Sequence, residues 1–466
     1  MSELNQNPEA GIRAERGGGG LGVMLRTLKS RNYRLFFMGQ GISLIGTWMQ
    51  QVAMGWLAYR LTNSAFWLGF INFSARIPIF VLVPFAGVLA DRWNRRRILV
   101  ITQTLSMVQA LALAALVITN LVQVWHLVAL SLFLGLVNAM DTPARQAFIV
   151  DMIERKQDLG NAIALNSTIV NGARLVGPSV AGLLIAAVGE GWVFLINGLS
   201  YVAVIIALLA MVIPAQKREA RETRVLAELM EGARYVFGFA PMRSILLLVS
   251  LVSLTGMPYV VLMPIFAKNI FHGGPHTLGF LMGAAGTGAL VGALILASRR
   301  SALGLDRLIV WACLMFGGGL AGFAFSRFYW LSLVLLALTG FGMILQLASS
   351  NTVLQTLVDD DKRGRLMSFY TMAFMGMAPF GSLLAGSLAA KIGAPDTILV
   401  GGVASILGAA WFAARLPAMR RLMRPILAGK GLMPAAPPSF SPAAESGKPS
   451  TGNPELDSPS PPEKIR

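Results

Sequence analysis

The feature that most constrains this chain is a series of apolar stretches, each about as long as a helix that crosses a lipid bilayer. Such a helix needs about 20 predominantly apolar residues. Twelve stretches approach this length, and short charged segments separate them. They cover residues 35–59, 65–90, 98–119, 125–143, 161–188, 192–213, 244–267, 277–298, 308–326, 329–350, 366–391 and 397–416. The sequence therefore predicts an all-α integral membrane protein with twelve transmembrane helices.

The composition agrees with a surface that faces lipid. Hydrophobic residues make up 55% of the 466 residues and charged residues 13%, whereas soluble domains carry about 25% charged residues. The net charge of +17 does not indicate nucleic-acid binding, because the basic residues lie in short clusters between apolar runs and not on a soluble face. We expect membrane lipid and a small-molecule substrate as partners, no nucleic acid, and a monomer.

The distribution of Lys and Arg predicts the orientation. If both termini are cytoplasmic, 33 of the 39 basic residues fall in the inner segments and four in the outer loops. Cytoplasmic loops of membrane proteins carry this excess. No cleavable signal peptide is expected. We therefore expect a multi-pass protein of the bacterial inner membrane with both termini in the cytoplasm.

The longest polar interruption divides the expected helices into six plus six. The expected organisation is a cytoplasmic tail (1–34), a six-helix bundle (35–213), a central cytoplasmic loop (214–243), a second six-helix bundle (244–416) and a cytoplasmic tail (417–466). The last tail is rich in Pro, Ser and Gly after about residue 431, so most of it should be disordered. The two bundles should be pseudo-symmetric, with a binding site between them near mid-membrane.

A charged motif lies between the second and third expected helices. It reads Gly87-Val88-Leu89-Ala90-Asp91-Arg92-Trp93-Asn94-Arg95-Arg96-Arg97. This segment resembles the signature loop of the major facilitator superfamily, Gly-x-Leu-Ala-Asp-Arg-x-Gly-Arg-Arg, with Asn94 where glycine is usual. Because asparagine also tolerates a left-handed turn, we expect the turn to be kept.

This resemblance implies that the motif takes part in gating and conformational change through Gly87, Asp91, Arg92, Arg95 and Arg96. In the superfamily, the acid at the position of Asp91 helps to hold the cytoplasmic side closed, which implies a contact near Gly364-Arg365. The alternative interpretation is a loop that only anchors the topology, since its arginines cannot enter lipid.

The fifth expected helix contains Gly177, Pro178 and Gly182. This run is similar to the Gly-Pro-x-x-Gly-Gly motif of exporting branches, with Ala181 in place of one glycine. Small residues let helices approach closely and proline weakens the helical hydrogen bonds. We expect this helix to bend or slide between the two halves. Ordinary small-residue packing is the alternative.

Further segments resemble one branch of the superfamily, which contains the enterobactin exporter and the macrolide efflux proteins. They are Gly46–Gln51, Asp141–Ala147 and Asn161–Ser167, within a resemblance that spans residues 25–415. The branch implies export of a small molecule (a siderophore, a drug or a similar metabolite) by alternating access. It also implies proton antiport, with the proton gradient as energy source and no cofactor.

Four charged residues fall within or beside the expected spans: Arg76, Asp141, Arg145 and Arg174. An arginine at the bilayer centre costs at least about 2.5–3.5 kcal/mol, so each should face the protein interior. We hypothesise a network of the four in the first half. It is either a structural salt bridge, or a proton-linked switch or an anchor for an acidic substrate. The acids placed to titrate are Asp91, Asp141 and Glu190.

Amides in the spans can join helices or contact a substrate. Gln50, Gln51 and Gln346 are the candidates for the substrate cavity. The run Gly283-x-x-Gly286-x-Gly288 follows no strand and is better interpreted as helix packing than as a dinucleotide loop. No metal site is expected, since a Gly-Gly-Pro turn separates His272 from His276.

No arrangement of catalytic residues is visible in the sequence, so we expect no enzyme activity. Three other classes stay open beside the exporter. The first is a membrane enzyme acting on lipid or isoprenoid substrates, which would need clustered acids or histidines. The others are a non-transporting receptor or scaffold with a transporter fold, and an importer. Substrate retention or uptake after loss of the protein separates them.

Overall fold

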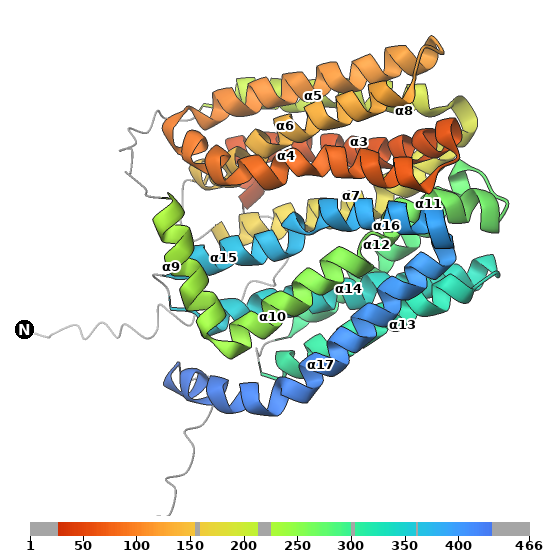
Figure 1. The fold of residues 1–466 in the computed structure, drawn as a ribbon. Coiled ribbons are helices and arrows are strands. Elements are labelled where there is room, and N and C mark those ends of the chain that lie inside the picture. The colour runs from red at the N-terminus through yellow and green to blue at the C-terminus, as the bar shows by residue number, and fades with distance from the viewer. Residues whose placement is uncertain (1–26, 154–158, 213–224, 300–302, 360–361, 431–466) are drawn as a thin grey trace, which may run out of the picture.

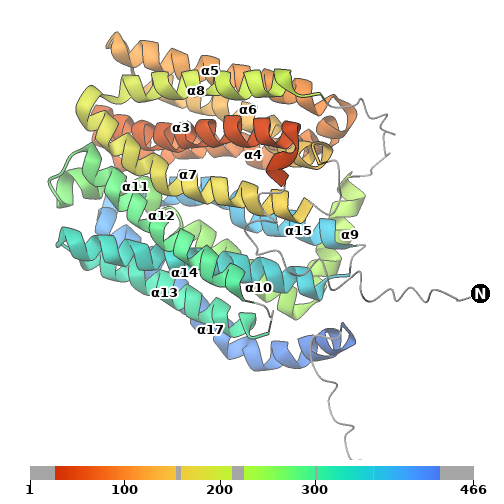
Figure 2. The ribbon, with the colours of Figure 1, turned by 180° about the vertical axis from the view of Figure 1, so that it is seen from behind.

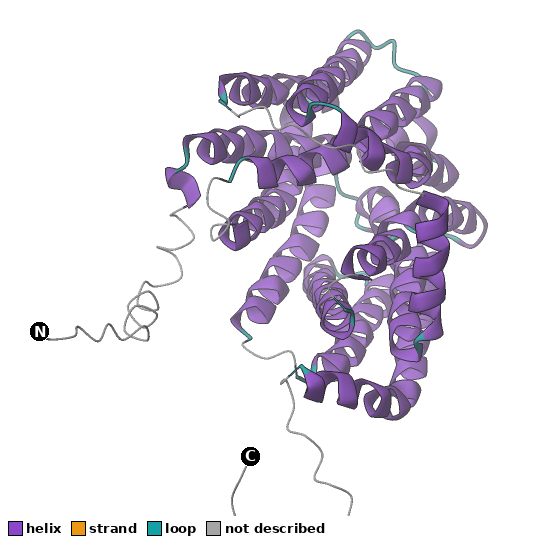
Figure 3. Cartoon of the chain, turned by 90° about the vertical axis from the view of Figure 1, so that its left-hand side faces the viewer, coloured by secondary structure: helices purple, strands orange, loops and turns teal. Residues whose placement is uncertain are grey.

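The computed structural model describes residues 27–153, 159–212, 225–299, 303–359 and 362–430 (Figure 1). Within these ranges every regular element is a helix (Figure 3). The first half comprises α3 (Arg31–Thr62), α4 (Ala65–Arg92), α5 (Arg95–Ile118), α6 (Val124–Asp151), α7 (Leu159–Val188) and α8 (Glu190–Ala210), after the short η2 (Thr27–Lys29). The prediction of an all-α protein is confirmed for this part of the chain.

The second half begins after α9 (Val225–Gly238). It comprises α10 (Ala240–Leu251), η4 (Val252–Gly256), α11 (Tyr259–Ile265), η5 (Phe266–Ile270), α12 (Pro275–Ser298), α13 (Leu305–Phe325), α14 (Tyr329–Leu357), α15 (Arg363–Thr371), η7 (Met372–Gly376), α16 (Ala378–Ile392) and α17 (Ala394–Gly429). The segments α10–η5 and α15–α16 each run as one apolar stretch, over Ala240–Ile270 and Arg363–Ile392.

Three π-helical segments interrupt these stretches, at η4, η5 and η7. Pro258 follows η4 and Pro379 follows η7 within a few residues. Proline lacks the N–H that would continue the helical hydrogen bonds, and the wider turn relieves the clash of its ring with the preceding turn. Ser253 of η4 and Phe374 and Met375 of η7 line a hollow between the two halves.

Eleven helical segments in the described ranges are long and apolar enough to cross a membrane, judged by length and composition alone. The first expected crossing, α3, is not among them, although its 32 residues are long enough. Its polar residues, including Gln40, Gln50 and Gln51, lower its mean hydropathy. Because Gln40 and Gln50 are buried against other helices, they need not contact lipid. The count of twelve crossings stays a prediction.

Helix boundaries differ from the expected ranges at several places; α6 and α14, for example, continue to Asp151 and Leu357. α3 begins at Arg31, inside the expected tail, and α9 lies within the expected central loop. α17 continues past residue 416 to Gly429. Two contacts hold this extension: Arg420 pairs with Asp306, and the Lys430 ammonium donates to the carbonyl of Val358 at 2.7 Å. Pro417 and Pro425 lie inside the extension without ending it.

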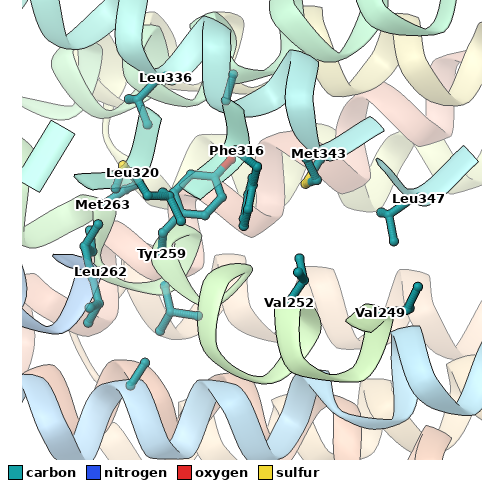
Figure 4. Close-up of a cluster of buried hydrophobic side chains, with 14 of the residues drawn as sticks. Val249, Val252, Tyr259, Leu262, Met263, Phe316, Leu320, Leu336, Met343 and Leu347 are labelled. Atoms are coloured by element: carbon teal, nitrogen blue, oxygen red, sulfur yellow. The ribbon is translucent and has the colours of Figure 1, made fainter. Parts of the chain in front are cut away.

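The helices form two groups that lie side by side (Figures 1 and 2). The N-group is α3–α8 and the C-group is α10–α17. Within the C-group, Tyr259 packs against Phe316 with ring centroids 6.4 Å apart, and Leu320 and Met343 belong to the same cluster (Figure 4). The groups meet along two helix pairs, α4 with α16 and α7 with α12.

Apolar side chains also cover outward faces. On α8, Leu199, Val202, Ile206 and Leu209 follow a helical spacing and are 57%, 39%, 61% and 59% exposed. A contiguous exposed apolar stripe of this kind is unusual on a protein surrounded by water. The stripe is therefore the surface that a lipid bilayer covers.

Candidate functional site

A cavity lies between the N-group and the C-group. Two adjoining hollows of about 980 and 1420 Å³, open solvent included, share Gln51, Asn72 and Arg76. The smaller hollow is lined by α3, α4 and α7 on one side and by η4, α11, α12, α14, η7 and α16 on the other. The larger hollow is lined mainly by α3, α4, α5, α6 and α8 of the N-group, and by α11 and α12 of the C-group. Without open solvent the two hollows measure about 130 and 280 Å³, and because ligand sites typically enclose about 300–1,000 Å³, only the two together have room for a small molecule.

The two helix pairs close this cavity at one end, the end where α3 finishes and α4 begins; we call it the closed end. There Gly182 on α7 meets α12 so tightly that a Cβ would lie 2.9 Å from the Cα of Gly279. Gly69 on α4 meets Gly386 on α16 in the same way, at 2.9 Å. Such contacts need glycine at each of these positions, because any side chain would separate the backbones.

Polar contacts cross between the groups at the same end. The Asn269 amide donates to the Tyr59 hydroxyl at 2.7 Å, and the Lys268 ammonium donates to the Asn63 side-chain oxygen at 2.9 Å. Sequence reasoning missed these contacts, since nothing in a single sequence pairs residues more than 200 positions apart. The closed end is thus fixed by both backbone packing and hydrogen bonds.

Of the antiporter-like motif, Gly182 lies at this contact between the groups, whereas Gly177 packs within the N-group. A Cβ at Gly177 would lie 2.6 Å from the Cβ of Trp48 on α3. Pro178 lines the cavity. The glycine run of α12 also serves packing: Gly286 approaches the backbone of α7, with its would-be Cβ 3.0 Å from the Arg174 carbonyl oxygen. Helix packing was thus the correct interpretation of that run. The gating role of Gly177, Pro178 and Gly182 stays a prediction.

Arg76 and Arg174 both line the cavity. The Arg76 Nε donates to the Asn72 side-chain oxygen at 3.1 Å, one turn earlier on α4. The Arg174 guanidinium lies over the Trp48 ring, 5.4 Å from its centroid. In the part of the chain that the structure describes, neither guanidinium forms an ion pair.

Asp141 lies apart from these two arginines. It is 1% exposed, pairs with Arg145, and accepts hydrogen bonds from Thr102 at 2.7 Å and Gln103 at 2.8 Å. The hypothesised four-residue network is therefore divided: Asp141 and Arg145 form one pair with α5, and within the described ranges no hydrogen bond or ion pair joins them to Arg76 or Arg174. Only the Arg145 end of this pair reaches the cavity wall.

The three candidate glutamines have different surroundings. Gln51 faces both hollows of the cavity. Gln50 also borders the larger hollow, but its amide is engaged with Gln109 at 3.0 Å and Asn197 at 2.7 Å, and so joins α3 to α5 and α8. Gln346 is 1% exposed and lines neither of these two hollows, so its expected contact with the substrate stays a prediction. It lies on the buried face of α14 because that helix packs against its neighbours through Gly340 and Gly342.

The charged motif is only partly described. Gly87, Asp91 and Arg92 lie on the last turns of α4, and their side chains lie outside the described residues, as does the expected contact of Asp91. Gly364 lies in the first turn of α15, next to Arg365. The Arg365 guanidinium forms an ion pair with Glu231 of α9 at 2.7 Å. This pair ties the central segment to the C-group.

The other arginines of the motif bind within the N-group. Arg95 forms an ion pair with Asp151 at 3.0 Å, at the end of α6. Arg96 donates to two carbonyl oxygens in the last turn of α8, both at 2.7 Å. A cation at a helix C-terminus satisfies carbonyls that lack a helical partner. Both arginines therefore fasten helix ends in this state.

Asn94 does not form the expected left-handed turn. Its φ is −67° and its ψ is 108°, and its side chain accepts from the Arg97 backbone N–H at 3.2 Å. Asn94 is thus the N-cap of α5, a role for which asparagine is among the most favoured residues. The chain turns here by ending one helix and capping the next, and glycine is not required.

Comparison with known proteins now decides the class. Residues 24–428 match the family described as transmembrane secretion effector. The chain belongs to this family, a branch of the major facilitator superfamily. Relatives include the staphyloferrin A transporter of Staphylococcus aureus, 26% identical over 80% of this chain and 93% of the relative. Another is the multidrug efflux pump Tap of Mycolicibacterium fortuitum, which is 27% identical over 78% of this chain and 88% of the relative.

Macrolide efflux protein A of Streptococcus pyogenes is 23% identical over 80% of this chain and 94% of its own length. Among solved structures, a bacterial homologue of the lysosomal transporter Spinster, in an inward-facing state, aligns with a TM-score of 0.64 at 13% identity over 87% of this chain and 98% of that one. A bacterial homologue of the iron transporter ferroportin, also inward-facing, aligns with a TM-score of 0.64 at 16% identity over 83% of this chain and 98% of that one. These structures establish the transporter fold. The predicted family and exporter branch are confirmed, and the protein is a multi-pass membrane transporter of the efflux type.

Proposed function

We propose that this transporter is a secondary-active exporter, which moves a small molecule out of the bacterial cytoplasm by alternating access. The observation that carries the proposal is the cavity between two helix groups that close over it at one end through Gly69–Gly386 and Gly182–Gly279. Two groups that rock about such a cavity expose it to each side in turn. The relatives named as efflux pumps and as a siderophore transporter favour export of a siderophore, drug or similar metabolite.

The excess of Lys and Arg supports the orientation with both termini in the cytoplasm and twelve crossings, α3 included. In that orientation the closed end is periplasmic, and the state described here faces inward. The inward-facing states of the two structural neighbours agree with this assignment.

Proton antiport is the proposed energy source. Asp141 is the one described carboxylate beside the cavity, held by Arg145, Thr102 and Gln103. Protonation of Asp141 would break its ion pair with Arg145, on the cavity wall, and so link proton binding to the shape of the cavity. The role of Asp91 in closing the cytoplasmic side is retained as part of the proposal.

The experiment compares cells with the wild-type protein, with a deletion, and with Asp141→Asn. Metabolites and a drug panel are measured inside and outside the cells, and proton movement is followed in everted vesicles when the retained compound is added. Export predicts that the deletion retains one class of compound and that the wild type releases protons from the vesicle lumen. Lower uptake in the deletion strain would instead show an importer, and unchanged coupling in Asp141→Asn would remove that residue from the mechanism.

A further inference from the structure

The charged side chains that line the described walls of the cavity all carry the same sign. The charged side chains that line its described walls are Arg76, Arg145 and Arg174, all cations. Arg145 is neutralised by Asp141 behind it. Arg76 and Arg174 line the same hollow, and within the described residues neither forms an ion pair. The described cavity therefore carries two positive charges without a compensating acid.

The five acids that form the other ion pairs of the described residues are engaged with other cations. Asp151, Glu190, Glu231, Asp306 and Asp359 each pair with another Arg or Lys. Asp91 lies on the same helix as Arg76, but 15 residues later, which is about 22 Å along the helix axis. A cation in such a low-dielectric interior is retained only with a partner or a function. The missing partner is therefore expected to be a ligand.

The free hydrogen-bond donors point to the chemistry of that ligand. Within the described part of the chain, the Arg76 guanidinium donates one hydrogen bond to protein, through Nε, and the Arg174 guanidinium donates none and lies over the Trp48 ring. A guanidinium offers five N–H donors in a planar fork that matches a carboxylate or phosphate. Gln51 and the amide of Asn72 lie on the same wall. This set of donors suits an anion, and it disfavours an organic cation.

The opposite wall is apolar and adaptable. Five methionines of the C-group line it, which we call the methionine wall: Met257, Met263, Met282, Met343 and Met375. Phe374 and Tyr259 add aromatic surface. Methionine is flexible and polarisable, so such a wall accepts varied apolar shapes. A ligand that fills the cavity therefore has an acidic end toward the N-group and an apolar body toward the C-group.

We propose that the substrate is an organic anion whose carboxylate or other acidic group binds Arg76 and Arg174 while its apolar body contacts the methionine wall. The proposal rests on the proposed function in one respect, namely that the bound molecule is the one transported. An inside-negative membrane potential then favours export, because negative charge moves outward with the substrate.

The test uses the full chain purified in detergent and three probes that share one apolar body: naphthoate, naphthalene methanol and naphthylmethylammonium. Naphthoate should bind at least about 10-fold more tightly than the alcohol, since hydrogen bonds between charged groups are the stronger ones. Arg76→Gln and Arg174→Gln should each abolish that preference, and Arg76→Lys should keep part of it. Any result without a preference for naphthoate in the wild type overturns the proposal.

The matched control is Arg327→Gln, an exposed arginine whose guanidinium donates to the carbonyl oxygens of Ala324 and Ser326. It should bind naphthoate as the wild type does. The melting temperature without ligand separates binding from structure. The melting temperature of Arg76→Gln should equal or exceed that of the wild type, because the substitution removes a cation that has no ion-pair partner among the described residues. A lower melting temperature together with an unchanged preference for naphthoate would show a structural arginine and overturn the proposal.

Vesicle transport distinguishes this proposal from the proposed function. If naphthoate is preferred but no compound is exported, the exporter assignment fails and the anion site stands. If the double variant Arg76→Gln/Arg174→Gln exports a neutral or cationic compound at the wild-type rate, the anion assignment fails and the exporter stands.

Discussion

Replacing Gly182 by alanine should open the closed end. A Cβ at this position would lie 2.7 Å from the Pro275 carbonyl oxygen and 2.9 Å from the Gly279 Cα, and both are backbone atoms that cannot rotate away. Overpacking of this kind costs about 1–3 kcal/mol. If that cost falls only on the state with α7 against α12, the ratio of closed to open molecules drops by roughly 5- to 150-fold.

The assay measures distances between spin labels by double electron–electron resonance. Labels at Leu61, near the end of α3, and at Lys391, near the end of α16, report the separation of the two groups at the closed end. The buried Cys313 is first replaced by alanine. Gly182→Ala should add a population at longer distance that the parent lacks.

Gly172→Ala is the matched control on the same helix. A Cβ at Gly172 would meet nothing within 4 Å, so this change should leave the distances unchanged and only raise helix propensity, by about 1 kcal/mol. Equal distance distributions for the Gly182 and Gly172 variants would refute the reasoning, because the glycine contact would then not hold the groups together.

Other substitutions test the contacts within the N-group by thermal unfolding. Asp141→Asn should lower the free energy of unfolding by about 3–5 kcal/mol, because it leaves the Arg145 guanidinium uncompensated. The double variant Asp141→Asn/Arg145→Gln should regain part of this free energy, and a further loss would contradict the pairing. Arg96→Ala should lower the free energy of unfolding by about 1–2 kcal/mol, because it removes two hydrogen bonds to the end of α8. Arg97→Ala, at an exposed position, should change this free energy little, and equal effects of the two variants would argue against the capping role. Gln50→Leu should lose at least about 1–3 kcal/mol, since it strands two buried amides; a neutral result would mean that these amides find other partners.

The sequence predicted the helices well because an apolar run of membrane length has few alternatives. The expected helix over 161–188 corresponds to α7 (Leu159–Val188), and the one over 277–298 corresponds to α12 (Pro275–Ser298). The π-helical η4 and η7 were not predicted. Their composition is that of ordinary apolar helix, and only Pro258 and Pro379 nearby hint at a disturbed hydrogen-bond ladder.

The site was harder to predict than the fold, since it depends on which helix faces meet. Asp141 and Arg145 are four residues apart on one helix, so their pairing follows from helical geometry. Nothing local shows that Arg76 turns to Asn72 or that Arg174 lies over Trp48 on α3. The same holds for Gln346: its polarity favours the cavity, whereas the packing of α14 buries it away from both hollows described here.

The most direct test of alternating access follows both ends of the molecule at once. One label pair is Leu61 with Lys391 at the closed end; the other is Gly160 with Gly364, exposed residues at the start of α7 and of α15. Distances are recorded at different pH values, with and without an exported compound. The account predicts that the second pair approaches as the first separates. Two ends that open together, or a closed end that never opens under any of these conditions, would contradict it.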